Sequence, residues 1–305
     1  MTWWQAIVLG VVQGLTEFLP VSSTAHLIVV QQWFGLPADG PFTTVVQLGT
    51  LVAVFIYFRS DLWRVAKAVL SDLKQLRVGT TPDSRLAWLM VVGTVPAGLV
   101  GVLFSKPIKH HFYDPTSIGV VSIVFALLML AAEIWHRTRK EDRHLPELGD
   151  PDLTWKEAIW VGLWQACALL PGASRSGCTI SGALFAGMSR STAARFSFLL
   201  SLPAILAAGL KDLISERQTL LASQDQLVNL ALATVVSGVV GYAAVAWLVG
   251  FLKRSTMTGF VVYRVALGVV LVGLAVTGVL VKPLPADSRA TVVPTAPPPA
   301  TPPPP

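Results

Sequence analysis

The sequence has few charged residues and almost no cysteine. Only 13% of its 305 residues are Asp, Glu, Lys or Arg, while 53% are hydrophobic. With apolar runs of about eighteen residues or more, this composition favours a helical membrane protein over a soluble one. The two cysteines, Cys167 and Cys178, have neither CxxC nor zinc-ligand spacing. The sequence therefore predicts no disulfide framework and no zinc site.

The net charge of +6 does not indicate a nucleic-acid partner. The basic residues lie between the apolar runs and form no stripe interleaved with aromatic residues. Cytoplasmic loops of membrane proteins collect Lys and Arg in this way. Residues 1–6 carry no basic side chain and no Ala-x-Ala site follows, so we expect no cleaved signal peptide.

The apolar runs fall into two length classes. A membrane-spanning helix needs about twenty residues. Six runs are long enough, at 41–58, 86–104, 117–135, 193–210, 228–250 and 257–281. Four shorter runs form two pairs, 3–17 with 22–34 and 155–170 with 177–188, each broken at Leu-Pro. Two short helices around a polar break predict a re-entrant hairpin.

The second half of the chain repeats the first. Gly10-Val-Val-Gln13 parallels Gly162-Leu-Trp-Gln165, and both precede a Leu-Pro pair and a hydroxyl cluster. Each half thus has one hairpin and three spans. Because three is an odd number of crossings, the second half starts on the opposite side of the membrane and has the inverted orientation. Basic residues in 59–85, in 136–154 and at Lys253-Arg254 then fall on one side, the cytoplasmic side.

The expected fold is an all-α integral membrane protein of two inverted-topology repeats, with both termini outside. Each repeat is a re-entrant helix hairpin plus three transmembrane helices. The expected divisions are a first repeat at 1–135, a cytoplasmic linker loop at 136–154, a second repeat at 155–281 and a Pro-rich disordered tail at 282–305.

The first polar break holds a carboxylate, hydroxyls and an imidazole. Gln13 and Glu17 are one helical turn apart, so they share a face. A membrane-embedded pair of this kind can bind a hard cation or act as a base. The alternative is a glutamate exposed at a helix end. Ser23 and His26 share a face if 22–34 is helical, a pairing that activates a nucleophile; the alternative is a helix cap beside an interfacial histidine.

The second polar break, Pro171-Gly-Ala-Ser-Arg-Ser-Gly-Cys-Thr179, predicts an anion site. A Gly-rich turn that opens a helix presents N–H groups and the positive end of the helix dipole. Ser174, Ser176 and Thr179 add donors, and Arg175 adds a planar fork for phosphate oxygens. Arg264, near the start of the last span, is expected to snorkel to the interface.

Both breaks resemble signature motifs of one family. Gln13-Gly-Leu-Thr-Glu-Phe-Leu-Pro-Val-Ser-Ser-Thr-Ala-His26 and the segment 171–179 resemble those of the undecaprenyl-diphosphate phosphatase (bacitracin-resistance protein) family. The resemblance runs from about residue 5 to 281 and includes Gly93-Thr-Val-Pro96, Arg195-Phe-Ser-Phe198 and Tyr263-Arg264. The family pattern has Glu or Gln, then any three residues, then Glu. This chain has Gln13 and Glu17 at these two positions, so it supplies one carboxylate instead of two.

The resemblance implies hydrolysis of C55 isoprenyl diphosphate to the monophosphate and phosphate, which recycles the lipid carrier of cell-wall synthesis. It implies a site on the outer face of the bacterial cytoplasmic membrane and a divalent cation, Mg²⁺ or Ca²⁺, held by Glu17 and Gln13. The expected catalytic residues are Glu17, Ser23, His26 and Arg175. The expected substrate-binding residues are Gln13, Ser22, Thr24, Gly172, Ser174, Ser176 and Thr179. Ser23 is the preferred nucleophile, and direct attack by water with His26 as base stays open.

Two other functions are weighed against this one. Inverted repeats with broken helices are a common transporter design, so a transporter or flippase for a polyprenyl phosphate is the alternative. Acid-phosphatase-type lipid phosphatases carry Ser-Gly-His and Arg-x5-His patterns, which the sequence lacks. The expected partners are undecaprenyl diphosphate and the bilayer, with no nucleic acid; a homodimer is left open.

Overall fold

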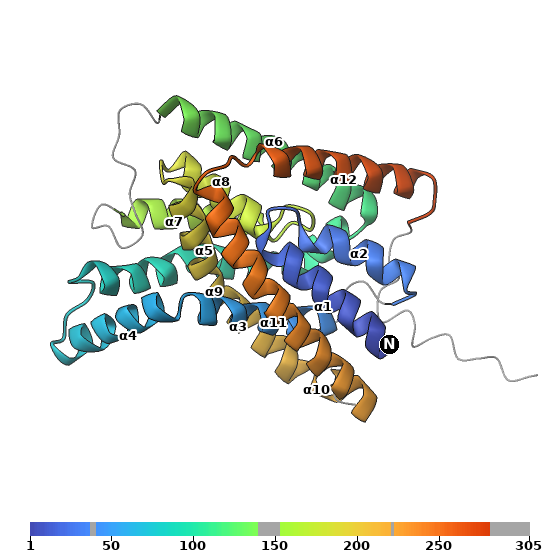
Figure 1. The fold of residues 1–305 in the computed structure, drawn as a ribbon, viewed down its shortest axis with the longest axis horizontal. Helices are drawn as coiled ribbons and strands as arrows, with labels where there is room; N and C mark the ends of the chain where they lie inside the picture. Colours follow the sequence, from blue (N-terminus) through green and yellow to red (C-terminus); the bar gives the residue numbers. More distant parts are fainter. Residues whose placement is uncertain (37–40, 140–152, 221–222, 281–305) are drawn as a thin grey trace, which may run out of the picture.

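A computed structural model describes residues 1–36, 41–139, 153–220 and 223–280, and within these segments the chain is helical, with no β-strand (Figure 1). The helices are α1 Trp3–Phe18, α2 Ser23–Trp33, α3 Pro41–Tyr57, α4 Arg59–Lys74, α5 Pro82–Phe112, α6 Pro115–Arg139, α7 Trp155–Cys167, α8 Arg175–Phe185, α9 Arg190–Ser215, α10 Arg217–Leu220, α11 Gln224–Leu252 and α12 Thr258–Val276. The predicted tail and most of the predicted linker lie outside the described residues.

Several helices are long and apolar enough to cross a membrane, which indicates a multi-pass membrane protein. In the described residues these are α5, α6, α9, α11 and α12, with α3 and α4 together as a sixth candidate. Each matches one of the predicted spans, although α12 ends at Val276 rather than at residue 281.

Both short helix pairs are present, and each second helix starts at a serine cap. Ser22 (φ 72°) caps α2 and Ser174 (φ 68°) caps α8, and each side-chain oxygen accepts the backbone N–H three residues on. A positive φ is uncommon for a residue other than glycine. The second of these helices begins at Arg175, earlier than the predicted residue 177, because Ser174 provides the cap.

The prediction that 59–85 is a loop is wrong. Helix α4 follows α3 after a bend of 78° at Phe58, and α5 begins at Pro82. One face of α4 packs on the core through Val65 and Val69, while Arg59, Arg64 and Lys67 are exposed and Asp72 is buried. Similarly, most of the predicted loop 105–116 is the last part of α5. Hydropathy marks where an apolar run ends, and a helix can continue beyond that point as an amphipathic one.

Glycines bring the helices of the two halves into close contact. On α1, a Cβ atom at Gly10 would lie 2.7 Å from the carbonyl oxygen of Ala233 in α11. On α7, a Cβ atom at Gly162 would collide with the carbonyl oxygen of Gly93 in α5. Small residues at such crossings allow the tight backbone packing that holds membrane helices together. The aligned glycines of the two halves therefore serve the same purpose.

The pair α6 and α12 lies side by side along one edge of the molecule, over the helices of the hairpins (Figure 1). Gly119 and Gly268 face each other across this pair, where a Cβ atom on either would lie under 3 Å from the other's carbonyl oxygen. This pair places residues of α12 directly behind the polar breaks.

The close approach at Gly49 predicts a stability difference between two Gly→Ala variants. A Cβ atom at Gly49 of α3 would collide with the carbonyl oxygen of Thr234 in α11, whereas at Gly98 no atom lies within 4 Å. We expect Gly49→Ala to cost about 1–3 kcal/mol through overpacking and to lower Tm in detergent by roughly 2–10 °C. Gly98→Ala is the matched control. Equal Tm values for both variants would contradict the tight α3–α11 contact.

Candidate active site

The two polar breaks meet at a buried ion pair. Arg175 Nη2 donates to Glu17 Oε1 at 2.8 Å across 158 positions of sequence. The Ser176 hydroxyl donates to the carbonyl oxygen of Leu19 at 3.1 Å, which joins the same two segments again. Residues from both breaks line one cavity of about 280 Å³: Glu17, Ser22, Ser23, Thr24, Gln47, Ala168, Leu169, Leu170, Gly172, Ser174, Arg175, Ala204, Ile205 and Ala208.

Glu17 is almost fully buried, and both of its oxygens are bonded. Oε1 accepts from Arg175, and Oε2 accepts from Gln13 Nε2 at 2.7 Å. Removing either charge of a buried pair strands the other at a cost of several kcal/mol. The two charges therefore depend on each other, and the side chain of Arg175 keeps 18% of its surface exposed.

Within the described part of the chain, the first turn of α8 leaves backbone N–H groups unpaired, an arrangement that is typical of anion-binding helix starts. The Ser174 hydroxyl accepts the N–H of Gly177 at 3.2 Å, and among the described residues none accepts the N–H of Ser174, Arg175 or Ser176. Gly172 has φ +97°, and a Cβ atom there would collide with the carbonyl oxygen of Ile118. Glycine is therefore required for this turn, and three free N–H groups remain at the helix start.

The start of α2 faces the same cavity. Ser22 caps this helix, and Ser23 and Thr24 line the cavity beside Glu17. The Ser23 hydroxyl has no hydrogen-bond partner in the described part of the chain, so it is free to turn toward a ligand. Two helix N-termini thus point at one cavity and together favour an anion there.

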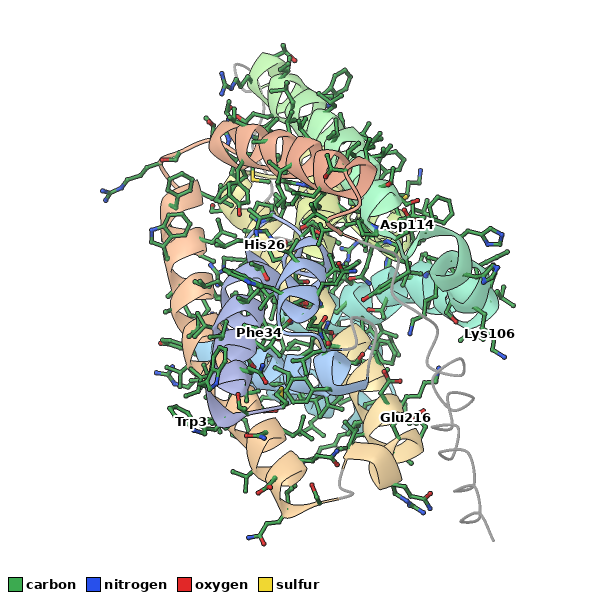
Figure 2. All side chains as sticks on the ribbon, turned by 90° about the vertical axis from the view of Figure 1, so that its right-hand side faces the viewer. Trp3, His26, Phe34, Lys106, Asp114 and Glu216 are labelled. Carbon is green, nitrogen blue, oxygen red and sulfur yellow. The ribbon has the colours of Figure 1, made fainter. Side chains whose placement is uncertain are left out.

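His26 does not pair with Ser23, contrary to the expectation from their spacing. Its Nδ1 lies 2.8 Å from the carbonyl oxygen of Ser22, and its Nε2 lies 2.6 Å from the hydroxyl of Tyr263 in α12. A carbonyl only accepts, so Nδ1 carries the proton and Nε2 of the neutral ring accepts from Tyr263. Figure 2 shows His26 close to α12. The imidazole of His26 thus stabilises the first turn of α2 through its hydrogen bond to Ser22, and it is not among the residues that line the cavity.

Two other residues expected to bind substrate have hydroxyls directed into the protein. Thr179 Oγ1 donates to the carbonyl oxygen of Arg175 at 2.8 Å and contacts the Ser197 hydroxyl. Ser176 Oγ is bonded to Leu19, as described above. These side chains fix the position of α8, while the backbone N–H of Ser176 remains available to an anion.

Arg264 does not snorkel, which overturns the expectation from its position near a helix end. It is fully buried, and its Nη2 donates to the carbonyl oxygens of Gly172 at 2.9 Å and Ala173 at 2.8 Å. The sequence does contain a signal for this role. Arg264 stands about two turns inside an apolar run that lacks other charges, too deep for its side chain to reach water along the helix.

The donor set fits a hard divalent cation. Glu17 supplies one carboxylate, and the buried Gln13 Oε1 has no hydrogen-bond partner. No group of three His, Cys, Asp or Glu side chains with metal-site spacing occurs in the described segments. Mg²⁺ typically takes one or two carboxylates and completes its shell with water and substrate phosphates. A flip of the side-chain amide of Gln13 would exchange its Nε2 and Oε1 positions and place the oxygen beside the Glu17 carboxylate.

Comparison with known proteins places the chain in a family. The family model described as "Bacitracin resistance protein BacA" matches residues 6–270. A protein of Chlorobium phaeobacteroides (strain BS1) named undecaprenyl-diphosphatase is 47% identical over 281 residues, which cover 92% of this chain and 99% of that protein. One of Chloroherpeton thalassium with the same name is 48% identical over 277 residues, 90% of this chain and 98% of that protein. The chain belongs to the bacitracin resistance protein BacA family.

Proposed function

We propose that this chain is an undecaprenyl-diphosphatase, which hydrolyses the C55 isoprenyl diphosphate to the monophosphate and phosphate and so recycles the carrier lipid of cell-wall synthesis. The observation that carries the proposal is the Glu17–Arg175 contact, which joins both motifs at one cavity. The relatives that share over 40% of its residues bear the name of this activity.

The two halves are inverted-topology repeats, each built on a re-entrant hairpin. Two features support this arrangement. Helix α1 packs on α11 and α7 packs on α5, through the aligned glycines Gly10 and Gly162. The caps Ser22 and Ser174 share an unusual backbone conformation and the same hydrogen bond. In this topology the hairpin tips meet inside the bilayer, and both chain ends lie outside.

The lipid substrate enters the cavity from the membrane. Besides its polar groups, the cavity is lined by the apolar side chains of Ala204, Ile205 and Ala208 from α9 and of Leu169 and Leu170. These side chains suit the first isoprene units, while the rest of the tail stays in the bilayer. Following the loop charges, the site opens to the outer face of the bacterial cytoplasmic membrane. A homodimer is not required, because one chain supplies both motifs.

Substrate binding exchanges the partners of Arg175. In the resting site Arg175 neutralises Glu17; with substrate bound it turns to the terminal phosphoryl group, beside the free N–H groups of Ser174, Arg175 and Ser176. These donors stabilise charge on the phosphoryl oxygens in the transition state. Glu17 and Gln13 are then free to hold Mg²⁺ or Ca²⁺, which when bound neutralises charge on the diphosphate.

Ser23 is the proposed nucleophile. Its Oγ forms a bond to the terminal phosphorus while the bond from that phosphorus to the bridging oxygen breaks, and the lipid monophosphate leaves. Water then hydrolyses the phosphoserine to release phosphate. His26 can accept the proton from Ser23, or from water in a direct attack, only after its Nε2 separates from the Tyr263 hydroxyl. Catalysis by His26 therefore requires a rearrangement of the resting hydrogen bonds.

A transporter or flippase for a polyprenyl phosphate is the second candidate, favoured by the repeat-like packing of α1 on α11 and α7 on α5. Phosphate release from undecaprenyl diphosphate by the detergent-purified protein separates the two, because detergent leaves no second side to transport to. A transporter alone would release none.

Loss of either member of the ion pair should abolish hydrolysis. We expect Glu17→Gln and Arg175→Met each to lower kcat on the order of 10²–10³-fold or more, because each removes a group that interacts with the transferring phosphoryl group or its cation. The exposed residues Glu216 and Arg217 provide matched controls, Glu216→Gln and Arg217→Met. Phosphate release is the measurement. Near-normal rates for Glu17→Gln or Arg175→Met in folded protein would refute the site.

The attack by Ser23 predicts a covalent intermediate. With radiolabelled terminal phosphate and an acid quench, wild type should retain label that Ser23→Ala lacks, and Ser23→Ala should lose at least about 10³-fold in kcat. The exposed Ser60 gives the control variant Ser60→Ala. Retention of most activity by Ser23→Ala would instead establish direct attack by water.

The cation should bind through the Gln13–Glu17 pair. A chelator should stop phosphate release, and added Mg²⁺ or Ca²⁺ should restore it. Gln13→Leu should raise the cation concentration needed for half-maximal rate on the order of tenfold, because one oxygen donor is lost. Gln13→Glu, which adds a second carboxylate, should lower that concentration. Activity unaffected by chelation would contradict the cation site.

A further inference from the structure

Arg264 is a buried cation with no anionic partner. It is the largest fully buried side chain, and no Asp or Glu in the described segments pairs with it. Two of its three nitrogens, Nε and Nη1, are buried without a hydrogen-bond partner. A buried, unpaired charge costs several kcal/mol, so such a residue is retained only where the charge or its geometry is needed.

Arg264 fixes the orientation of two successive peptide groups. Its Nη2 binds the carbonyl oxygens of Gly172 and Ala173 together. In a trans peptide the N–H points opposite to the C=O. The first of these peptide groups joins Gly172 to Ala173. Its N–H, that of Ala173, donates to the carbonyl oxygen of Leu170 at 3.0 Å, within the turn. The N–H of the second peptide group belongs to Ser174, so it points away from Arg264, and Ser174 is one of the residues that line the cavity.

The unpaired part of the guanidinium lies under the first turn of α8. A Cβ atom at Gly177 would be 2.8 Å from Arg264 Nη1 and 3.2 Å from Ser174 Oγ. The positive charge thus stands directly behind the N–H groups that face the cavity. Burial limits screening by water, so an anion on the front of this turn interacts strongly with a charge on its back.

We propose that Arg264 is the positioning residue of the phosphoryl-binding turn, and that the terminal phosphoryl group of the substrate compensates its unpaired charge. It turns the carbonyl oxygens of Gly172 and Ala173 away from the cavity, and it adds a second positive charge to that of Arg175. That the anion is the terminal phosphoryl group of the substrate rests on the proposed function. That Arg264 orients this turn for an anion does not.

The neighbouring residue supports the other hairpin in a related way. Tyr263 donates to His26, and His26 Nδ1–H holds the carbonyl oxygen of Ser22. Consecutive residues of α12 therefore stabilise the turns before α2 and α8, directly in one case and through an imidazole in the other. The carbonyl oxygens of Ser22, Gly172 and Ala173 are thus bonded to nitrogen donors of side chains.

The test measures the effect of inorganic phosphate on thermal stability, together with hydrolysis. We expect phosphate to raise the Tm of the wild type in detergent. Arg264→Met, which removes an uncompensated charge, should stay folded without phosphate but lose most of the phosphate-induced rise, and kcat should fall on the order of 100-fold. Arg264→Lys, which keeps the charge without the planar fork, should recover part of the phosphate effect. Arg254→Met, at an exposed position, is the control.

The outcomes separate the two proposals. A phosphate-induced rise in Arg264→Met equal to that of wild type would overturn the role of Arg264, as would the absence of any rise in an active wild type. If Arg264→Met does not fold, the phosphate affinity of Arg264→Lys decides: an unchanged affinity overturns the proposal, and an affinity lowered about tenfold supports it. A wild type that releases no phosphate from the lipid but shows an Arg264-dependent rise would refute the phosphatase and leave the anion site standing.

Discussion

The ion pair between Glu17 and Arg175 constrains the whole molecule. Its members lie 158 positions apart, at the breaks of two short helix pairs that must face each other. Neither helix pair can hold this position alone, because α2 and α8 have only 11 residues each. Their supports are the long helices behind them, α11 for the first hairpin and α5 for the second. Glycines at these crossings fix the hairpins within the narrow tolerance that a 2.8 Å ion pair requires.

The turns before α2 and α8 are strained in a way that serves the same site. Ser22 and Ser174 both have positive φ values, which cost free energy in residues other than glycine. This conformation lets each helix begin with its N–H groups facing the cavity. Hydrogen bonds from His26 to the first turn and from Arg264 to the second hold the carbonyl oxygens in place. The donors are therefore oriented before an anion arrives, which is the condition for effective electrostatic stabilisation.

The sequence predicts the short helix pairs and most of the spans, because each rests on a local signal. Leu-Pro breaks, hydroxyl caps and apolar length are all properties of short segments. The errors concern properties that depend on tertiary contacts. The helical period places Ser23 near His26, but a tyrosine 237 positions away takes the imidazole nitrogen. Arg264 resembles an interfacial arginine until the packing of α12 on α6 shows that it is enclosed. The charged residues of α4 outnumber the apolar ones that pack on the core, so apolar length does not reveal this helix in the sequence.

Glutamine at position 13 is compatible with the charge balance of the proposed complex with the diphosphate and a divalent cation. A lipid diphosphate carries up to about three negative charges at neutral pH. Against these, the resting site has the cations Arg175 and Arg264 and the anion Glu17, and a divalent metal adds two positive charges. The sum of these groups and the diphosphate is then close to neutral, as a buried site requires. A second carboxylate at position 13 would leave a net negative charge. In the proposed complex, an amide oxygen at Gln13 can contribute to the cation site without adding a further anion to the charge that Arg264 and Arg175 offset.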